Sequence, residues 1–416
     1  MPAFRPISYN RNGTIALSLL CSAFIAGCSH GSAGSMPGIP VGGGSAAGAG
    51  LRQAILLGGK SIPSCPTVYN FKAQPDGTLP TSELFDFNGL LYGTTSTGGT
   101  SDLGTVYSVT PGGSETVLHS FTGAPDGSSP AAGLVTVKGA LYGTTVHGGK
   151  FGDGAVFKMT PSGVVSIVYS FSSTPDGAEP NATLINVNGT LYGTTFVGGA
   201  NGNGSVFSVT TSGVEKVVYS FKNGSDGANP VASLVHYQGD FYGTTVDGGN
   251  GGGNNYGTVF KLTSTGKEIV LHRFTGGADG ALPRAGLIEV GGAFYGTTSG
   301  RGTSGGGTVF KIATSGHLTA LHQFGGSGDG SIPFAGLLNV NGTLYGTTDE
   351  FIGNGLGSVF SITTSGAESV VCIWPSTNHD SGSQPMASLI DVGGALYGTT
   401  DAGGTTPDGT VFATPL

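Results

Sequence analysis

Charged side chains are scarce in this chain. Lys, Arg, Asp and Glu make up 10% of its 416 residues, and the formal net charge is −8. Proteins that bind nucleic acid through its phosphates carry clustered Lys and Arg, and the sequence has no such cluster. The composition therefore argues against nucleic acid and other acidic polymers as partners.

Long apolar runs are also rare, and the one candidate lies near the N-terminus. Arg5 and Arg11 precede an uncharged stretch, residues 14–25, that leads into Ala26-Gly27-Cys28. This layout is typical of a secretory signal, so residues 1–28 are expected to be absent from the mature fold. No second apolar run of about 18 residues follows, and no transmembrane helix is predicted.

The end of this signal also resembles the lipobox of bacterial lipoproteins, because an aliphatic residue and two small residues precede Cys28. The resemblance implies that Cys28 is lipidated and that Ser29 favours sorting to the outer membrane. Cys21 is the competing cysteine, but Leu20 before it is a poor match where a small residue is preferred. A secretory signal without a lipid is the alternative. In the lipoprotein interpretation, the lipid is the only contact with a membrane.

Glycine, serine, alanine and proline dominate residues 29–64. This segment has too little apolar surface for a core, so we predict a flexible tether. Its one apolar interruption is residues 54–57, and the sequence leaves open whether these residues dock on the domain that follows.

A tandem repeat accounts for the 80 glycines and 21 prolines, a composition that indicates disorder in an aperiodic chain. The sequence Tyr-Gly-Thr-Thr recurs seven times, and it begins at Tyr92, Tyr142, Tyr192, Tyr242, Tyr295, Tyr345 and Tyr397. Gly-Thr-Val-Phe or a near variant follows each copy. An Asp followed by Gly and Pro precedes each copy, from Asp76 with Pro80 to Asp380 with Pro385.

The third repeat shows the strand pattern. An apolar run at 182–187 ends at Asn188-Gly189, and a second run follows at 191–195, which predicts a hairpin with a two-residue turn. Two further strands are expected at 205–210 and 215–221. Such blades cannot bury both faces alone, so the sequence predicts an all-β fold, a seven-bladed β-propeller of four-stranded antiparallel blades over residues 65–416.

The two ends of the repeat array complement each other. The seventh repeat stops after Gly409-Thr410-Val411-Phe412 and lacks a fourth strand. Residues 67–71 match the fourth-strand pattern of residues 117–121 and precede the first full repeat. We therefore predict that this N-terminal strand completes the last blade and leaves no open sheet edge.

Cys65 and Cys372 are the only cysteines of the predicted domain. An exported protein lies in a compartment that favours disulfides, and the two residues belong to neighbouring blades around the ring. A disulfide between them is one expectation. The other is that Cys372 serves as a small buried apolar residue, because outer strands of adjacent blades diverge and a bridge needs close Cα atoms.

The repeat resembles the GloVer tandem repeat of bacterial surface proteins, through Leu-Tyr-Gly-Thr-Thr, the Gly-Gly that usually follows it, and Gly-Thr-Val-Phe. The resemblance covers residues 66–415 and implies a propeller-like surface protein with differing anchors and no known reaction. A looser similarity to kelch propellers rests on double glycines such as Gly148-Gly149. The copper ligands of a galactose-oxidase-like site are not visible.

Several motifs with catalytic or metal-binding form have a simpler structural interpretation. Residues 302–306, Gly-Thr-Ser-Gly-Gly, fit the serine-hydrolase motif but lack its strand, turn and helix. His119, His272 and His322 stand where other repeats have tyrosine, so we expect them to pack between blades. The Asp-Gly of each repeat predicts a capped turn, and the repeated tyrosines predict packing between blades. We assign no catalytic residue, no metal and no cofactor.

Residues that differ between repeats carry more information about function, because repeated residues serve the scaffold. The loops after Tyr-Gly-Thr-Thr offer seven candidate binding residues, although a solvated rim would carry such residues too. They are His147, Lys150, Asp247, Arg301, Asp349, Glu350 and Asp401.

Two functions compete on these data. The first is a non-catalytic cell-surface scaffold or binding protein, lipid-anchored, expected to be a monomer, that recognises glycan or protein through one rim. The second is an enzyme acting on extracellular polysaccharide, a glycoside hydrolase or lyase with carboxylates from the variable loops. Two such carboxylates within about 5–10 Å at the central channel would favour the enzyme.

Overall fold

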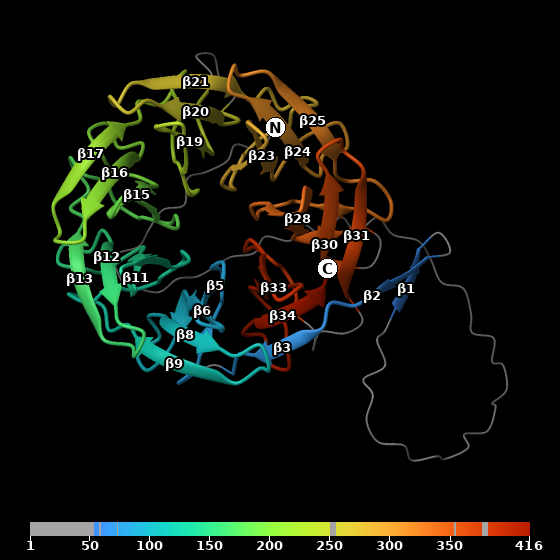
Figure 1. The fold of residues 1–416 in the computed structure, drawn as a ribbon, viewed down its shortest axis with the longest axis horizontal. Coiled ribbons are helices and arrows are strands. Elements are labelled where there is room, and N and C mark those ends of the chain that lie inside the picture. Colours follow the sequence, from blue (N-terminus) through green and yellow to red (C-terminus); the bar gives the residue numbers. More distant parts are fainter. Residues whose placement is uncertain (1–53, 58–59, 73, 250–254, 353–354, 377–381) are drawn as a thin grey trace, which may run out of the picture. The chain divides into compact units, whose positions relative to one another are not determined.

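The structure is a computed structural model, and it confirms the predicted seven-bladed β-propeller (Figure 1). It describes residues 54–57, 60–72, 74–249, 255–352, 355–376 and 382–416. The predicted signal with Cys28, most of the predicted tether and Asp380 lie outside the described residues. No helix occurs within the described ranges, and so none there could span a membrane.

Each blade contains four antiparallel strands, which in blades 1 to 6 follow the chain from the central channel outward (Figure 1). Blade 1 consists of β5 (Phe85–Phe87), β6 (Leu90–Thr95), β8 (Thr105–Val109) and β9 (Glu115–Ser120). Blade 2 consists of β10 (Val135–Val137), β11 (Ala140–Thr145), β12 (Ala155–Met159) and β13 (Val165–Ser170). Blade 3 consists of β14 (Ile185–Val187), β15 (Thr190–Thr195), β16 (Ser205–Thr210) and β17 (Glu215–Ser220). Blade 4 consists of β18 (Val235–Tyr237), β19 (Asp240–Thr245), β20 (Thr258–Leu262) and β21 (Glu268–Arg273).

Blades 5 and 6 have the same order, whereas blade 7 takes its outermost strand from the N-terminal side of the array. Blade 5 consists of β22 (Ile288–Val290), β23 (Ala293–Thr298), β24 (Thr308–Ala313) and β25 (Leu318–Gln323). Blade 6 consists of β27 (Leu338–Val340), β28 (Thr343–Thr348), β30 (Gly355–Thr363) and β31 (Glu368–Pro375). Blade 7 consists of β32 (Ile390–Val392), β33 (Ala395–Thr400), β34 (Thr410–Pro415) and β3 (Thr67–Asn70). Short additional strands pair as β4 (Gly77–Thr78) with β7 (Thr97–Gly98), and β26 (Gly330–Ser331) with β29 (Glu350–Phe351).

The inner hairpin of each blade forms where the sequence predicts it. In blade 3, Asn188 and Gly189 both have positive φ, 54° and 86°, and Val187 pairs directly with Thr190. This is the backbone that a two-residue turn of type I′ requires, and Asn-Gly adopts it at little cost. The predicted bounds of the third strand agree with β16, and the fourth strand ends one residue earlier than predicted.

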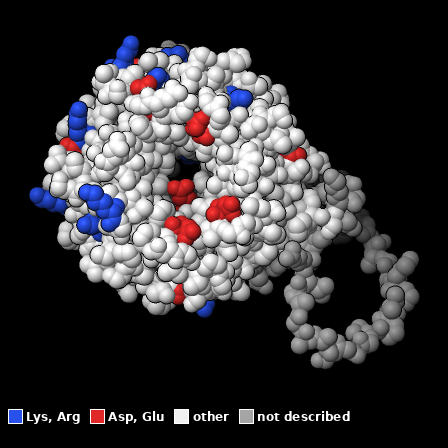
Figure 2. Space-filling view, viewed as in Figure 1, with Lys and Arg blue, Asp and Glu red and all other residues white. Residues whose placement is uncertain are grey.

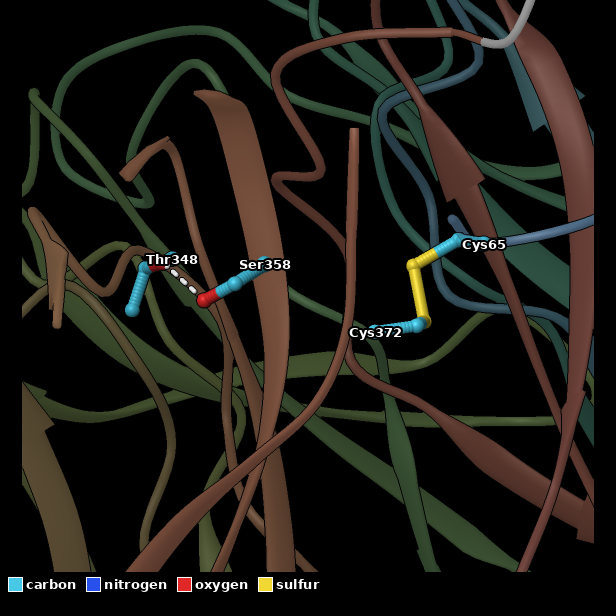
Figure 3. Close-up of a disulfide and its surroundings, with 4 residues drawn as sticks. All are labelled: Cys65, Thr348, Ser358 and Cys372. Carbon is cyan, nitrogen blue, oxygen red and sulfur yellow. Dashed lines mark hydrogen bonds between the residues drawn. A yellow bond between two sulfur atoms is a disulfide. The ribbon is translucent and has the colours of Figure 1, made fainter. Parts of the chain in front are cut away.

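Each residue of Tyr-Gly-Thr-Thr has a definite packing role. The tyrosine is buried in five blades and half-buried at Tyr192 and Tyr345. The glycine lies under an aromatic ring of the neighbouring strand: a Cβ on Gly193 would come within 2.7 Å of the ring of Phe207. The first threonine, as in Thr194, donates to a carbonyl of the next blade, that of Ala232. The second bonds to the start of the third strand, as between Thr348 and Ser358 (Figure 3).

Aromatic pairs fill all seven junctions between blades. The residue that follows the fourth strand of one blade meets a ring on the third strand of the next at an edge-on angle. Phe171 and Phe207 represent the series, with ring centroids 4.9 Å apart, and both are buried. At the last junction Trp374 takes this place against Phe412. Similar edge-on aromatic contacts therefore hold each pair of neighbouring blades together.

The N-terminal strand closes the ring as predicted. β3 pairs antiparallel with β34, the last strand of the chain (Figure 1). Phe71, which follows β3, is fully buried against Tyr107 of blade 1. Blade 7 thus contains strands from both ends of the chain, and β3 covers the edge of β34 that would otherwise be exposed.

A disulfide joins Cys65 and Cys372, with Cα atoms 5.1 Å apart (Figure 3). Both cysteines are buried. The amide of Cys65 also donates to the carbonyl of Ile373, so the chain before β3 is tied to β31 of blade 6 by two kinds of bond. The disulfide therefore links blades 6 and 7.

Part of the segment predicted as a tether forms a hairpin. β1 (Ala54–Leu57) pairs antiparallel with β2 (Lys60–Pro63), and Ser64 then bridges to Ile373. The apolar run at 54–57 is the first strand of this hairpin, an outcome that the sequence had left open.

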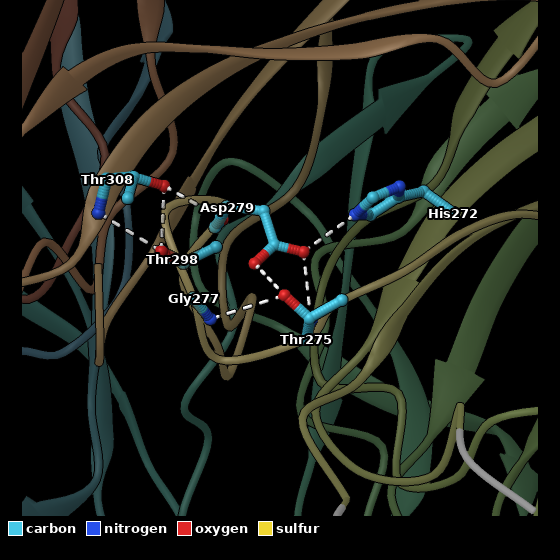
Figure 4. A network of polar contacts seen from close by, with 6 residues as sticks. All are labelled: His272, Thr275, Gly277, Asp279, Thr298 and Thr308. Carbon is cyan, nitrogen blue, oxygen red and sulfur yellow. Dashed lines mark hydrogen bonds and ion pairs between the residues drawn. The ribbon is translucent and has the colours of Figure 1, made fainter. Parts of the chain in front are cut away.

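A polar contact recurs beside six of the seven aromatic pairs among the described residues, and we call it the clasp. It joins a Tyr or His on the fourth strand of one blade to the Asp seven residues later, as Tyr169 hydroxyl donates to Asp176 at 2.6 Å. The same carboxylate accepts from a backbone amide, that of Ser172, and so caps the turn. At the seventh pair, Trp374 with Phe412, Cys372 of the disulfide takes the place of the Tyr or His. Figure 4 shows the clasp of His272 and Asp279, whose nearest atoms are 3.1 Å apart. The histidines therefore have a polar role in addition to packing.

Candidate functional site

The central channel is lined by one short segment from each blade. This segment follows the pattern Pro-x-Ala-y-Leu, with Ser in place of Ala in blade 1. Alternating residues of an extended chain face opposite sides, so Ala and Leu are buried in the blade while x and y line the channel. The x residues are Thr81, Ala131, Asn181, Val231, Arg284, Phe334 and Met386, and the y residues are Glu83, Gly133, Thr183, Ser233, Gly286, Gly336 and Ser388. The cavity between them measures about 130 Å³.

Glu83 is the single carboxylate among these lining residues. Its side chain lies over Gly133 of blade 2, where a Cβ would come within 2.5 Å of Glu83 Cγ. Burial raises the pKa of Glu83, and a hydrogen bond with Thr183 of blade 3 opposes that shift. Thr183 also accepts from the amide of Gly133 at 2.9 Å. One carboxyl group thus connects three blades inside the channel.

Arg284 is the only cation among the channel-lining residues. Its guanidinium lies 5.4 Å from the ring centroid of Phe334 in the next blade. Burial lowers the pKa of Arg284, and the charge of Asp247 in the preceding blade opposes that shift. In turn, burial raises the pKa of Asp247 and Arg284 lowers it. The predicted residue Asp247 therefore belongs to a channel-mouth group with Arg284 and Phe334.

Asp349 on blade 6 and Asp401 on blade 7 form an acidic pair. Burial raises the pKa of Asp349 to about 6, with further increases from the charges of Glu350 and Asp401. Burial likewise raises the pKa of Asp401 to about 6. The Oδ1 atom of each aspartate is buried and accepts no hydrogen bond from a described residue. Two carboxyl groups on neighbouring blades thus combine raised pKa values with acceptor atoms that have no partner among the described residues.

Both aspartates follow strands that contact the channel segments. Thr347 donates to the carbonyl of Pro385, which precedes the lining residue Met386. Thr399 donates to the carbonyl of Ser82, which lies between the lining residues Thr81 and Glu83. The amides of Asp349 and Asp401 donate to the carbonyls of Ile332 and Gln384, each of which directly precedes the proline of a channel segment. Both aspartates therefore lie beside the N-terminal ends of these segments, which we call the mouth of the channel. Figure 2 shows the channel opening on one face of the ring, with acidic side chains around it.

Glu350 adjoins Asp349, and the remaining predicted residues occupy separate places on the ring. Glu350 is exposed and accepts from the hydroxyl of Ser331 within its own blade. His147 lies near Asp153 of its own blade: burial raises the pKa of Asp153, and the histidine opposes that shift. Lys150 is exposed, with its ammonium 5.0 Å from the ring centroid of Phe151.

Arg301 completes the predicted set, and it is exposed on blade 5 with its guanidinium 5.3 Å from the ring centroid of Tyr256. Of the seven predicted residues, the structure thus brings together Asp349, Glu350 and Asp401, and it places Asp247 beside Arg284. The serine of residues 302–306 lies in an exposed turn between β23 and β24, without a helix in the described chain after it.

The sequence prediction missed the channel residues Glu83, Arg284 and Phe334. A signal was available, because x and y vary from blade to blade within the otherwise constant Pro-x-Ala-y-Leu segment. Only variable positions can make one sector of a ring differ from the others.

A family model, the Gloeobacter/Verrucomicrobia repeat, matches residues 28–253 and 250–415. The chain belongs to this repeat family. The motif resemblance is thereby confirmed, and the repeat family carries the propeller described above. A search of curated proteins finds no match to the sequence.

Solved structures share the fold at low identity. A streptogramin B lyase is 15% identical with a TM-score of 0.55, and the alignment covers 83% of this chain and 96% of the lyase. A puromycin hydrolase mutant is 12% identical with a TM-score of 0.51, covering 85% of this chain and 55% of that one. A puromycin-hydrolyzing peptidase of Mycobacterium tuberculosis is 11% identical with a TM-score of 0.51, covering 85% and 54%. These similarities show the propeller fold alone.

Proposed function

We propose that this repeat-family protein is a non-catalytic binding protein of the bacterial cell surface, and that a glycan docks at the mouth of its central channel. The observation that carries the proposal is the pair of buried carboxylate oxygens on Asp349 and Asp401 that have no hydrogen-bond partner among the described residues. Buried polar atoms normally have one, and a ligand hydroxyl can supply it.

The remaining groups at the mouth suit the same ligand. Carboxylates accept hydrogen bonds from sugar hydroxyls, and Arg284 donates them. The ring of Phe334 offers an apolar face, as sugars present one of their own. These groups come from variable positions of blades 4 to 7, while the repeated residues hold the blades in place. A rigid ring with one distinct sector is a suitable frame for a specific site.

Export and a lipid anchor on Cys28 remain part of this proposal, as does a monomeric state. An uncharged leader followed by a lipobox-like tetrapeptide supports the anchor. A glycan bound at the surface of the same cell or a neighbouring one would then be held close to the membrane by the chain between anchor and ring.

Binding of the mature chain to an array of bacterial and plant polysaccharides tests the proposal. We expect one class of glycan to bind, and the double variant Asp349→Asn/Asp401→Asn to weaken that binding at least about tenfold, since each lost charge-assisted hydrogen bond costs roughly 1.5–3 kcal/mol. Lys150→Ala is the matched control, because Lys150 is charged and exposed but lies on blade 2 away from this group. Unchanged binding in the double variant would refute the site.

A second candidate function is an enzyme acting on polysaccharide. It is favoured by one observation, the two neighbouring carboxyl groups with pKa values of about 6. One such group could donate a proton while the other acts as a base. Release of reducing ends from the bound glycan, abolished separately by Asp349→Asn and Asp401→Asn, would support the enzyme. Binding without release would support the non-catalytic proposal.

A further inference from the structure

The clasps between blades differ in a regular way at their third position. The first two positions are the Tyr or His and the Asp of the clasp. The third is the first residue of the fourth strand in the next blade. Where the clasp contains a tyrosine, this residue is glutamate, as in Tyr69 with Glu115, Tyr169 with Glu215 and Tyr219 with Glu268. Where it contains His119 or His272, this residue is aliphatic, Val165 or Leu318.

The junction of blades 5 and 6 breaks this rule, because it combines a histidine with a glutamate. His322 Nε2 lies 3.1 Å from Asp329 Oδ2, and Glu368 begins the fourth strand of blade 6. One ligand atom from each of the three residues lies within 4.8 Å of the others. Among the described residues this is the only group of three or more His, Cys, Asp and Glu side chains with such spacing.

The exception leaves one carboxylate without the partner it has elsewhere. In a tyrosine clasp a hydroxyl proton lies between two carboxyl groups, as Tyr69 lies 2.6 Å from Asp76 and 3.4 Å from Glu115. At His322 the imidazole faces Asp329, so Glu368 has no tyrosine hydroxyl to donate to it. Its Oε1 atom is buried without a hydrogen bond from any described residue, as are the Oε1 atoms of Glu115, Glu215 and Glu268. A divalent cation would satisfy both carboxylates and the imidazole together.

The side chains are also held in orientations that suit ligation. The amide of Gly330 donates to Asp329 Oδ1 at 2.8 Å, which leaves Oδ2 directed at the histidine. The ring of His322 packs edge-on against Phe324, with centroids 4.7 Å apart. Such supporting contacts fix the direction of metal ligands. His322 and Asp329 keep side-chain exposures of 22% and 14%, so an ion can enter from solvent.

We propose that His322, Asp329 and Glu368 bind a zinc-class divalent cation that links blades 5 and 6. One nitrogen and two carboxylate oxygens are ligands that Zn²⁺ accepts, with water at the fourth position. The next junction supports a linking role, because Cys372 and Cys65 stand at the positions of His322 and Glu368 in the repeat, and they are joined by the disulfide. Two successive junctions would then carry a cross-link.

Calorimetric titration of the mature, chelator-stripped protein with Zn²⁺ tests this proposal. Two variants rebuild clasps that already exist in the chain and should therefore fold: His322→Tyr gives the tyrosine and glutamate form, and Glu368→Leu gives the histidine and aliphatic form. We expect the wild type to bind one equivalent of Zn²⁺ that both variants lose, or bind at least about tenfold more weakly. Glu115→Gln, at the same position of a tyrosine clasp, should bind as the wild type does.

Thermal melts and cobalt provide independent measurements. Zn²⁺ should raise the Tm of the wild type and of Glu115→Gln, and it should leave the Tm of His322→Tyr unchanged. Co²⁺ in place of Zn²⁺ should give visible absorption bands that His322→Tyr lacks. Absence of Zn²⁺ binding in the wild type, or equal binding in the wild type and both clasp variants, would overturn the proposal.

Discussion

At the scale of single residues, each position of the repeat keeps the same residue type because the space around it is limited. The glycine of Tyr-Gly-Thr-Thr is an example, because its φ is unremarkable and only the space above it is limiting. In blade 3 a Cβ on Gly193 would come within 2.7 Å of both Leu184 and Phe207. A close approach of a ring to the backbone therefore excludes every residue other than glycine there.

This close packing leads to a prediction for Gly193→Ala. We expect the substitution to lower the free energy of unfolding by about 1–3 kcal/mol, because overpacking displaces the buried ring of Phe207. Gly112→Ala is the control: this glycine is exposed, and a Cβ there would meet only Thr110 at 3.8 Å. Urea unfolding of both variants measures the difference, and equal midpoints would contradict the packing argument.

The acidic pair at the channel mouth can be examined through its titration. Because the charge of Asp401 contributes to the raised pKa of Asp349, Asp401→Asn should move the pKa of Asp349 down from about 6. Asp391→Asn, an exposed residue in β32 of the same blade, should leave it in place. Carboxyl NMR titration of Asp349 in the three proteins measures this. An unchanged midpoint in Asp401→Asn would show that the two groups do not interact.

At the scale of elements, the strand that closes the ring has more effect than its length suggests. β3 has four residues, yet it completes blade 7 and is followed by the fully buried Phe71. Without it, β34 would expose an edge and the junction with blade 1 would lose its aromatic pair. The described strands before it, β1 and β2, pair with each other and belong to no blade.

Two truncations separate these contributions. Deleting residues 65–72 should destabilise the propeller by more than about 3 kcal/mol, because it removes a buried phenylalanine together with a strand. Deleting residues 29–60 should have a much smaller effect. Thermal melts under reducing conditions compare the two and remove the contribution of the disulfide. Equal Tm values would contradict closure across the chain ends.

Strands and blade order could be predicted from the sequence because their signals are local and repeat seven times. The hairpin at Asn188-Gly189 and the strand at 67–71 are examples of this. The hairpin of β1 and β2 could not be predicted, because it occurs once and lies in a segment with little apolar character. A pattern that recurs in seven repeats can be predicted even where one copy is ambiguous, whereas an element that occurs once must be predicted from its own residues alone.

The candidate site could be predicted only in part, for a related reason. Asp349 and Asp401 stand out because they are charged residues in a glycine-rich loop. Glu83 and Arg284 lie within apolar segments, and their role depends on which side of an extended chain faces the channel. The clasps escaped notice because their members, such as Tyr69 and Glu115, lie in different repeats. Aligning the repeats would have shown Cys65 and Cys372 at two clasp positions.

At the scale of the whole molecule, the proposed membrane attachment rests on Cys28, which lies outside the described residues. If Cys28 carries the lipid, Cys28→Ser should move the protein from the membrane fraction to the soluble fraction, because the lipid is the proposed anchor. Cys21→Ser is the matched control and should leave the protein with the membranes. Immunoblots of fractionated cells expressing each form measure this. Continued membrane association of Cys28→Ser would contradict the lipoprotein assignment.

The clasps should also make the stability of the whole ring depend on pH. Burial, followed by the charge of the clasp aspartate, raises the pKa of Glu115 and Glu215 to about 7 and that of Glu268 to about 8. Burial and the charge of Asp329 raise that of Glu368 to about 7. The folded state therefore binds these protons more tightly than the unfolded state, in which glutamate titrates near 4.5.

The sign of the effect follows from this difference. The stabilisation is complete below about pH 4.5 and is lost as the pH rises through about 7 to 8, because ionised glutamates then face ionised aspartates across the junctions. We expect the Tm to fall between pH 5 and pH 8. Replacing Glu115, Glu215 and Glu268 together by glutamine should flatten this slope, whereas Glu289→Gln, outside the clasps, should not. Calorimetric melts across this range measure the slope. A Tm that rises with pH in the wild type would show that the clasp glutamates are ionised in the folded ring throughout.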